Sequence, residues 1–306
     1  MKKLYLVALA VIATVVDLHA QQDPHYTQYM YNMSVMNPAY AGSKENLSLG
    51  LLHRKQWIEL EDAPTTTTFF GHSPVGKNVG LGLSVISDKL GPVEENNVYG
   101  DFSYTLKLGG EHKLALGLKA GLTLHNVDYL TKIAPTLPQQ NDGAFGANVS
   151  NSYFNFGTGA FYYTNKYYLG LSVPNMIKGE HLDYDGKSYG NESKHYFLTG
   201  GYVFDINESV KFKPFFMVKS SFEAPASLDV STNFMFKDKF EIGGTYRLDD
   251  SFGAMVNYAV TPTIKIGYAY DHIVSDLKVT TPSSHEIILL FDVNFSKKVS
   301  RSPRYF

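Results

Sequence analysis

The stretch LALGLKAGLTL, residues 114–124, alternates between apolar residues and small or polar residues along its whole length. Successive side chains of an extended chain point to opposite faces, so this pattern predicts a β-strand with one leucine-rich face. That face carries Leu114, Leu116, Leu118, Ala120, Leu122 and Leu124, and the other carries Ala115, Gly117, Lys119, Gly121 and Thr123. Such a strand fits either the core of a soluble sheet or a wall that faces lipid.

The same alternation recurs at 79–87, 98–106 and 264–271, and no comparable stretch shows a helical period with capping residues. We therefore expect an all-β chain of about fourteen strands. An even number of strands, most of them long enough to cross a bilayer at a tilt, is typical of an outer-membrane barrel. The expected strands are 47–56, 65–72, 79–87, 97–107, 113–124, 152–162, 167–173, 195–205, 210–219, 226–235, 239–247, 251–260, 264–272 and 285–295.

The connections between these strands differ in length in a regular way. Those after even-numbered strands are short, whereas long loops are expected after odd-numbered ones, at 87–96, 125–151, 174–194 and 274–284. Two odd-numbered connections, after the ninth and eleventh strands, are short and depart from the rule. Short turns on one rim and long loops on the other are typical of outer-membrane barrels, in which the long loops face outside.

The second face of the strands separates a barrel from a soluble β-sandwich. A sandwich would expose larger polar residues there, but this face is rich in Gly, Ala, Ser, Asp and Asn with isolated charges. Charged residues make up 18% of the chain, below the roughly 25% of an average soluble protein. The pattern favours a transmembrane antiparallel up-and-down β-barrel of about 14 strands over 47–296, with the leucines against lipid and a wet, partly packed lumen.

The two ends of the chain are interpreted separately from the barrel. Residues 1–20 read as a signal peptide, with Lys2 and Lys3 before a short apolar run and cleavage near Ala20. Residues 21–46 are rich in Tyr and Met, and form either a periplasmic segment or a plug in the lumen. Residues 297–306 form a basic C-terminal tail. We expect an exported protein of the outer membrane.

Composition and motifs argue against catalysis and cofactors. The chain has no cysteine, and its net charge of −2 gives no reason to expect nucleic acid. There is no GxSxG, HExxH or phosphate-binding glycine loop, and no histidines at metal-ligand spacing. The Gly-x-Gly pairs at 80/82 and 157/159 lie inside strands, where small residues relieve a crowded lumen. We expect no enzyme, no cofactor and no metal.

His285 precedes Glu286 at the start of the last strand. One interpretation is a general base, as in a lipid hydrolase of the outer membrane. The favoured interpretation is a hydrogen-bonded pair at the rim or in the lumen.

Strand parity directs charges of both signs to the inside. A closed lumen usually pairs such charges across strands, so we expect an ion-pair network; the alternative is a binding surface for something that enters the barrel. The inward set is Lys119, Lys211, Lys213, Asp229, Asn233, Glu241, Arg247, Asn257, Lys265, Asp271, Glu286 and Asp292.

The stretch HRKQWIELEDAPTTTTF, residues 53–69, joins a basic cluster, the single tryptophan and an acidic turn. Trp57 is either an anchor at the membrane interface or part of a binding site for a partner.

Several ordered stretches together resemble the PorP/SprF outer-membrane proteins of the type IX secretion system. They begin with QQDPHYTQYMYNMSVMNPAYAGS (21–43) and continue with HRKQW, APTT and VGLGLSVISDKLGP. Later come FKPFFMVK, EAPASLDV, YRLDDS, IGYAYD, SHEIIL and the final SPRYF, so the resemblance covers essentially the whole mature chain.

The resemblance implies a role in secretion or cell-surface anchoring of particular adhesin-like client proteins that carry a C-terminal sorting domain. It also implies a possible link to gliding motility, and partners that include a periplasmic peptidoglycan-binding protein, components of the secretion motor and outer-membrane lipid. The loops 125–151 and 174–194 match the family least, and we expect client specificity there. The alternative function is a channel or transporter for small solutes.

Inward parity and the resemblance together give one set of candidate partner-binding or structural residues. They are Asn37, Pro38, Tyr40, Arg54, Gln56, Trp57, Pro64, Lys119, Lys219, Arg247, Tyr270, Asp271, His285 and Glu286.

Overall fold

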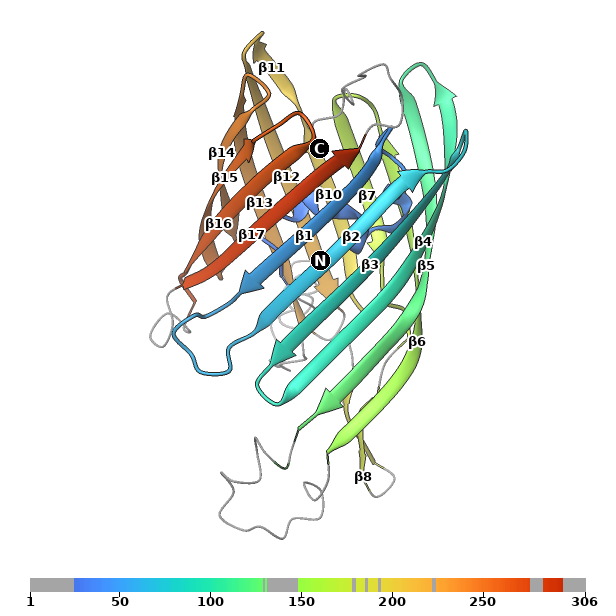
Figure 1. Cartoon of the computed structure of the whole chain (residues 1–306), viewed down its shortest axis with the longest axis vertical. Helices are drawn as coiled ribbons and strands as arrows, with labels where there is room; N and C mark the ends of the chain where they lie inside the picture. The colour runs from blue at the N-terminus through green and yellow to red at the C-terminus, as the bar shows by residue number, and fades with distance from the viewer. Residues whose placement is uncertain are drawn as a thin grey trace, which may run out of the picture.

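A closed antiparallel barrel with fourteen strand positions forms the wall of the protein (Figure 1). The computed structural model describes residues 25–128, 130, 148–177, 180–184, 187–191, 194–221, 224–275 and 283–293. The predicted fold class is confirmed. The predicted signal peptide and basic tail lie outside the described residues.

Each wall strand pairs with its neighbours in the chain, and the first strand pairs with the last to close the barrel. β10 (Tyr196–Tyr202) and β11 (Phe204–Asn207) together occupy one position beside β12 (Val210–Ser221), and β8 (Glu180–Tyr184) and β9 (Lys187–Asn191) form a separate hairpin. The wall strands are β1 (Leu47–Lys55), β2 (Thr65–Pro74), β3 (Val79–Leu90), β4 (Val93–Gly109), β5 (His112–Val127), β6 (Val149–Tyr163), β7 (Tyr167–Val173), β10 (Tyr196–Tyr202), β11 (Phe204–Asn207), β12 (Val210–Ser221), β13 (Ala224–Phe236), β14 (Phe240–Arg247), β15 (Ser251–Ala259), β16 (Ile264–Ile273) and β17 (Ser283–Val293).

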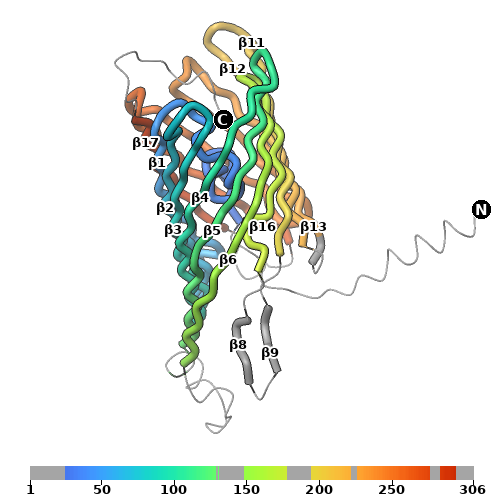
Figure 2. The backbone as a smooth tube through the Cα atoms, turned by 90° about the vertical axis from the view of Figure 1, so that its right-hand side faces the viewer, coloured from blue at the N-terminus to red at the C-terminus, as the bar shows by residue number. Residues whose placement is uncertain are grey.

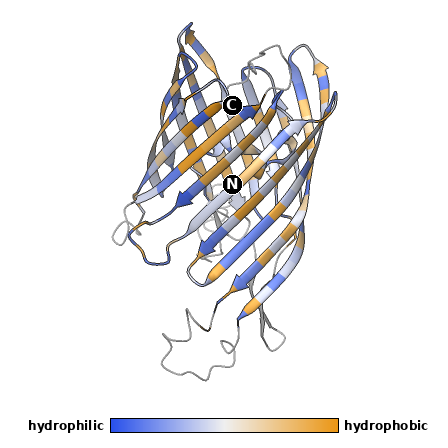
Figure 3. Ribbon diagram, in the orientation of Figure 1, coloured by the Kyte–Doolittle hydropathy of each residue, from blue (hydrophilic) through white to orange (hydrophobic). Residues whose placement is uncertain are grey.

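The leucine-rich face of β5 points outward. Leu118 is 62% exposed, whereas its neighbour Lys119 is 2% exposed and faces the lumen. The same alternation runs around the wall, where hydrophobic and hydrophilic residues follow one another along each ribbon (Figure 3). An outward apolar surface of this extent is suited to lipid.

The two rims of the barrel differ. At the upper rim in Figure 1, adjacent strands join through tight turns, and we call this the short-turn rim. The opposite end, where β5 ends and β6 begins, is the long-loop rim. By the usual orientation of such barrels, the short-turn rim faces the periplasm.

One loop prediction is wrong. Residues 87–96 were expected to form a long loop, but β3 runs to Leu90 and β4 begins at Val93, so only Gly91 and Pro92 connect them. Gly91 has φ +56°, which a tight turn tolerates at glycine. The extra ladder pairs Lys89 with Glu94 and lacks the apolar face on which the strand prediction rested.

A chain segment lies inside the barrel and is drawn in blue in Figures 1 and 2. We call residues 25–46 the lumen segment. It contains three short turns of helix, η1 (Tyr29–Tyr31), α2 (Met33–Met36) and η2 (Pro38–Tyr40), and most of its side chains are buried. Among the described residues, no helix is long and apolar enough to cross a membrane.

Candidate functional site

Asn37 and Pro38 set the conformation of the lumen segment. The Asn37 side chain caps η2 by accepting a 3.0 Å hydrogen bond from the Ala39 amide, and Pro38 occupies the first turn. The other end of the same amide donates to the carbonyl oxygen of Ala160 in β6, at 3.1 Å. One side chain therefore shapes the segment and attaches it to the wall.

Wall glycines make the room that the segment occupies. A Cβ atom on Gly117 would lie 2.1 Å from the Ala39 nitrogen, and one on Gly80 would lie 2.2 Å from the Ala41 oxygen. A Cβ on Gly159 would lie 2.1 Å from the Asn37 side-chain oxygen. Real Cβ contacts are never this close, so the segment packs directly on the backbone of β3, β5 and β6. For Gly80 and Gly159, the interpretation of the Gly-x-Gly pairs as relief for a crowded lumen is confirmed.

Tyr40 closes the packing on this side of the lumen. Its ring meets Phe161 and His72 edge to face, with centroids 5.1 and 5.2 Å away. His72 Nδ1 also accepts a hydrogen bond from the Gly42 amide at 3.2 Å. The aromatic and amide contacts fix the point where the segment turns toward β1.

Arg54 anchors the opposite end of the segment through a buried cluster. Its guanidinium lies 2.7 Å from Asp271 Oδ2 and 3.3 Å from Glu286 Oε2, and also donates to Thr27 Oγ1 at 2.7 Å. The Thr27 and Gln28 amides each donate to Glu286 at 2.9 Å. A charge this deeply buried is stable only when it is paired. The wall supplies the paired charges of this cluster, and the segment supplies the hydroxyl and amide groups that hydrogen-bond to them.

Two further lumen pairs involve candidate residues. Arg247 forms a two-pronged contact with Asp229, at 3.0 Å from both Nε and Nη2. Lys119 lies 3.0 Å from Asp101. Both pairs join neighbouring strands, so they stabilise the wall itself.

A third cluster connects the segment to the wall through Tyr31. Its hydroxyl donates to Glu241, which also pairs with Lys213 at 3.0 Å and accepts from Asn233 at 2.7 Å. The ammonium groups of Lys213 and Lys265 lie 5.3 and 5.0 Å from the centre of the Tyr31 ring. Burial and the Glu241 charge hold the pKa of the Tyr31 hydroxyl well above its usual value.

His25 begins the segment in a positively charged environment. Burial lowers the pKa of its imidazole well below the usual value, and the nearby charges of Lys219, Arg247, Arg54 and His195 lower it further. Lys219 is itself a buried residue of β12. The docked segment therefore favours neutral His25.

The predicted His285–Glu286 pair is wrong. Adjacent residues on a strand point to opposite faces, so Glu286 is buried in the lumen while His285 is on the outside. His285 Nδ1 hydrogen-bonds to the Tyr268 hydroxyl at 2.6 Å, and its ring lies edge-on to Tyr270 at 5.3 Å. This outward aromatic cluster resembles the interfacial belt of membrane barrels.

Gln56, Trp57 and Pro64 lie together in the β1–β2 connection at the long-loop rim. The Gln56 backbone N–H donates to the Pro64 carbonyl at 2.9 Å, and the Trp57 backbone N–H donates to Ser284 Oγ at 3.2 Å. Trp57 has φ +48°, a strained value for a bulky residue, so the surrounding hydrogen bonds must hold it. The structure thus places these candidates apart from the buried clusters.

Sequence reasoning missed Thr27, Gln28 and Tyr31 as anchors, because nothing in their spacing marks the wall residue that each one meets. It also left Asp101 out of the lumen set, although inward parity and its pairing opposite Lys119 could have identified it. Within the described part of the chain, no group of three or more acidic or histidine side chains could hold a metal ion. The lumen charges instead hydrogen-bond to the segment and pair with one another.

Comparison with solved structures finds other outer-membrane barrels. The CymD monoaromatic hydrocarbon channel is 12% identical with a TM-score of 0.51, and the match covers 90% of this chain and 94% of that one. Acinetobacter baumannii Omp33 is 10% identical, TM-score 0.49, with 82% and 100% covered. The P. putida toluene transporter TodX is 12% identical, TM-score 0.49, with 86% and 94% covered. At 12% identity, the similarity to CymD concerns the fold alone.

A comparison with curated protein sequences gives no significant match. The family model described as type IX secretion system membrane protein PorP/SprF matches residues 18–291. The matched range contains the lumen segment and almost the entire wall, so it includes every candidate residue discussed above. The barrel fold and this family are of a membrane protein in secretion and not of an enzyme class. The chain belongs to the PorP/SprF family of type IX secretion system membrane proteins.

Proposed function

We propose that this outer-membrane barrel is a docking platform that holds a secreted client protein of the type IX system at the cell surface. The client carries a C-terminal sorting domain and meets the barrel at the long-loop rim. The observation that supports this most is the lumen segment: residues 25–46 occupy the interior, and Thr27, Gln28 and Tyr31 hydrogen-bond to buried ion pairs of the wall. A filled lumen leaves the rims as the surfaces where a partner can bind, and it disfavours the alternative of a solute channel.

The long-loop rim offers apolar side chains on a rigid support. Ile58 is 38% exposed, in the connection whose Trp57 and Gln56 amides are tied down, and its own amide donates to the Ser283 carbonyl at 3.2 Å. Met176 and Ile177 are also exposed, and both of their amides donate to the buried Asn155 side chain at 3.0 Å. Apolar groups on a fixed backbone lose little entropy on binding, which suits protein recognition.

The proposal is tested by cross-linking the tagged full-length protein in living cells, followed by mass spectrometry. We expect a secreted protein with a C-terminal sorting domain among the captured partners. Recovery of lipid and barrel-assembly factors alone would contradict the proposal. A periplasmic peptidoglycan-binding protein or a motor component in the same sample would extend it to the other side of the membrane.

Matched variants locate the docking surface. The triple variant Ile58→Ser, Met176→Ser, Ile177→Ser should lower both client capture and the amount of client on the cell surface. The control carries Ile206→Ser and Val260→Ser, two equally apolar residues that are exposed at the short-turn rim, and it should behave as the wild type. Equal losses in the two variants would show that general surface hydrophobicity, rather than this rim, controls the outcome.

A further inference from the structure

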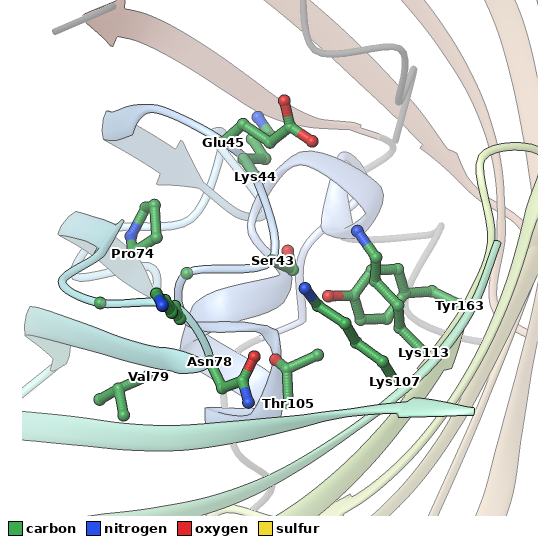
Figure 4. A pocket seen from close by; sticks show the side chains of 13 residues that line it. Ser43, Lys44, Glu45, Pro74, Asn78, Val79, Thr105, Lys107, Lys113 and Tyr163 are labelled. Atoms are coloured by element: carbon green, nitrogen blue, oxygen red, sulfur yellow. The ribbon is translucent and has the colours of Figure 1, made fainter. Parts of the chain in front are cut away.

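A pocket of about 280 Å³ lies at the short-turn rim, where the lumen segment leaves the barrel to join β1. The end of the segment supplies Ser43 and Lys44, and the β2–β3 turn supplies Lys77 and Asn78. The wall supplies Lys107 of β4 and Lys113 of β5 (Figure 4). Four lysines from three separate parts of the chain therefore surround one cavity.

Two of these lysines are placed against each other. Lys107 and Lys113 are direct partners across the β4–β5 ladder, and both extend toward the lumen segment in Figure 4. Like charges directly opposite in a sheet are destabilising, so the wall alone gives no reason for this pairing. The Lys113 ammonium also lies 5.8 Å from the centre of the Tyr163 ring, which positions it at the pocket wall.

The ratio of carboxylates to lysines is lower at the pocket than deeper in the lumen. Lys119 and Lys213 each lie 3.0 Å from a carboxylate oxygen and are almost fully buried. At the pocket, Lys44 lies 3.7 Å from Asp292, and Glu45 is the acidic residue among the described lining residues, against four lysines. The pocket therefore has an excess of positive charge at an opening that solvent reaches.

We propose that this pocket binds an acidic peptide segment that arrives from the periplasmic side. Several carboxylates on one chain match lysines that come from three directions, and the hydroxyl and amide groups of Ser43, Asn78 and Thr105 add neutral hydrogen-bond partners. Lipid headgroups are disfavoured because Lys107 and Lys113 lie on the lumen face, whereas Leu106 and Leu108 on the same strand are exposed on the lipid face.

The test uses the purified full-length protein in neutral detergent and a fluorescent hexapeptide of alternating Asp and Glu. We expect binding by fluorescence anisotropy that weakens as salt rises, because the contacts are charge pairs at an accessible site. The same peptide with Asn and Gln should not bind. The double variant Lys107→Gln, Lys113→Gln should bind the acidic peptide about tenfold more weakly, the loss expected from two partly exposed charge pairs.

The matched control is Lys166→Gln, Lys239→Gln, which removes two exposed lysines from other turns of the same rim. It should keep wild-type affinity. Equal weakening in both double variants, or no binding by the wild type, would overturn the proposal. Displacement of the peptide by inorganic phosphate or by an anionic lipid at equal charge concentration would also overturn it, in favour of that ligand.

A stability measurement separates a binding role from a structural one. Because Lys107 faces Lys113, the single variant Lys107→Gln should unfold at the same temperature as the wild type or a higher one, while its peptide affinity falls. A lower unfolding temperature would show that Lys107 serves the fold and would overturn the proposal. The pocket is on the rim opposite to the proposed client surface, so a negative result for peptide binding would not contradict the proposed docking function.

Discussion

The substitution Gly117→Ala should displace the lumen segment from the barrel. The added Cβ would lie 2.1 Å from the Ala39 nitrogen and 2.4 Å from the Pro38 carbonyl carbon, both backbone atoms that no rotamer change can move. Ordinary contacts between such atoms are about 3.5 Å, so the segment must retreat by more than about 1 Å.

A retreat of this size breaks the hydrogen bonds nearest to the clash. They are the donations from Ser103 Oγ to the Ala41 carbonyl at 2.5 Å, from Asn37 Nδ2 to the Ala160 carbonyl at 3.1 Å, and from Ser172 Oγ to the Met36 carbonyl at 2.8 Å. At about 0.5–1.5 kcal/mol each, the loss of these three bonds weakens docking by about 1.5–4.5 kcal/mol. The undocked population should rise roughly 10- to 1,600-fold, since about 1.4 kcal/mol corresponds to a factor of ten.

The assay uses the absence of cysteine from the chain. A single Ser34→Cys substitution places a reporter thiol on α2, where the wild-type side chain is 3% exposed. The rate of its reaction with a charged maleimide reports the undocked fraction, and Gly117→Ala should raise that rate by the factor above. Barrel integrity is checked in parallel by the heat-dependent shift in gel mobility.

Gly100→Ala is the matched control, because it lies on the outer face of the adjacent strand and its added Cβ would meet only the Ala120 oxygen, at 3.9 Å. It should leave the labelling rate unchanged. Identical rates in Gly117→Ala and Gly100→Ala would refute the reasoning, because a segment that tolerates this clash is not packed on the wall.

Three further predictions concern the anchors of the lumen segment. Arg54→Met leaves Asp271 and Glu286 buried without their cation, so the temperature of the gel-mobility shift should fall by an amount corresponding to about 3–5 kcal/mol. The control Lys55→Met, on the outer face of the same strand, should leave this temperature unchanged. Asn37→Ala removes the cap of η2 and the bond to Ala160, about 1–2 kcal/mol together, and should raise Ser34→Cys labelling roughly 5- to 30-fold; wild-type labelling would disprove the double role of Asn37. Because docking lowers the His25 pKa, the docked state binds fewer protons than the undocked state, and acid should favour undocking. Labelling of Ser34→Cys should therefore increase as the pH falls from about 7 to 5.5, and His25→Gln should reduce this increase. An equal pH response in His25→Gln would exclude this histidine as the cause.

Strand positions could be predicted because the barrel constrains every second residue. Lipid accepts only apolar side chains, as at Leu118, and the filled lumen requires small or paired ones, as at Gly117 and Lys119. Where strands extend past the lipid, that constraint disappears, and the ladder between Lys89 and Glu94 therefore gave no signal.

The candidate site was less accessible from the sequence. Glu241 pairs with Lys213 two strands away around the wall, and Arg54 reaches Asp271 in the same way, so neither partner follows from the pairing of neighbouring strands. The lumen segment has turns too short to show a helical period, and its anchors Thr27 and Tyr31 depend on its position in three dimensions. The error over His285 and Glu286 was avoidable, because strand parity alone places them on opposite faces.

The central claim is that a docked lumen segment closes this barrel. Planar-bilayer recording of the purified wild-type protein tests it most directly, with Gly117→Ala measured under the same conditions. We predict that the wild type inserts without stable conductance steps and that Gly117→Ala opens them. Stable open steps in the wild-type protein, of the same size as in Gly117→Ala, would contradict the claim and support a solute channel.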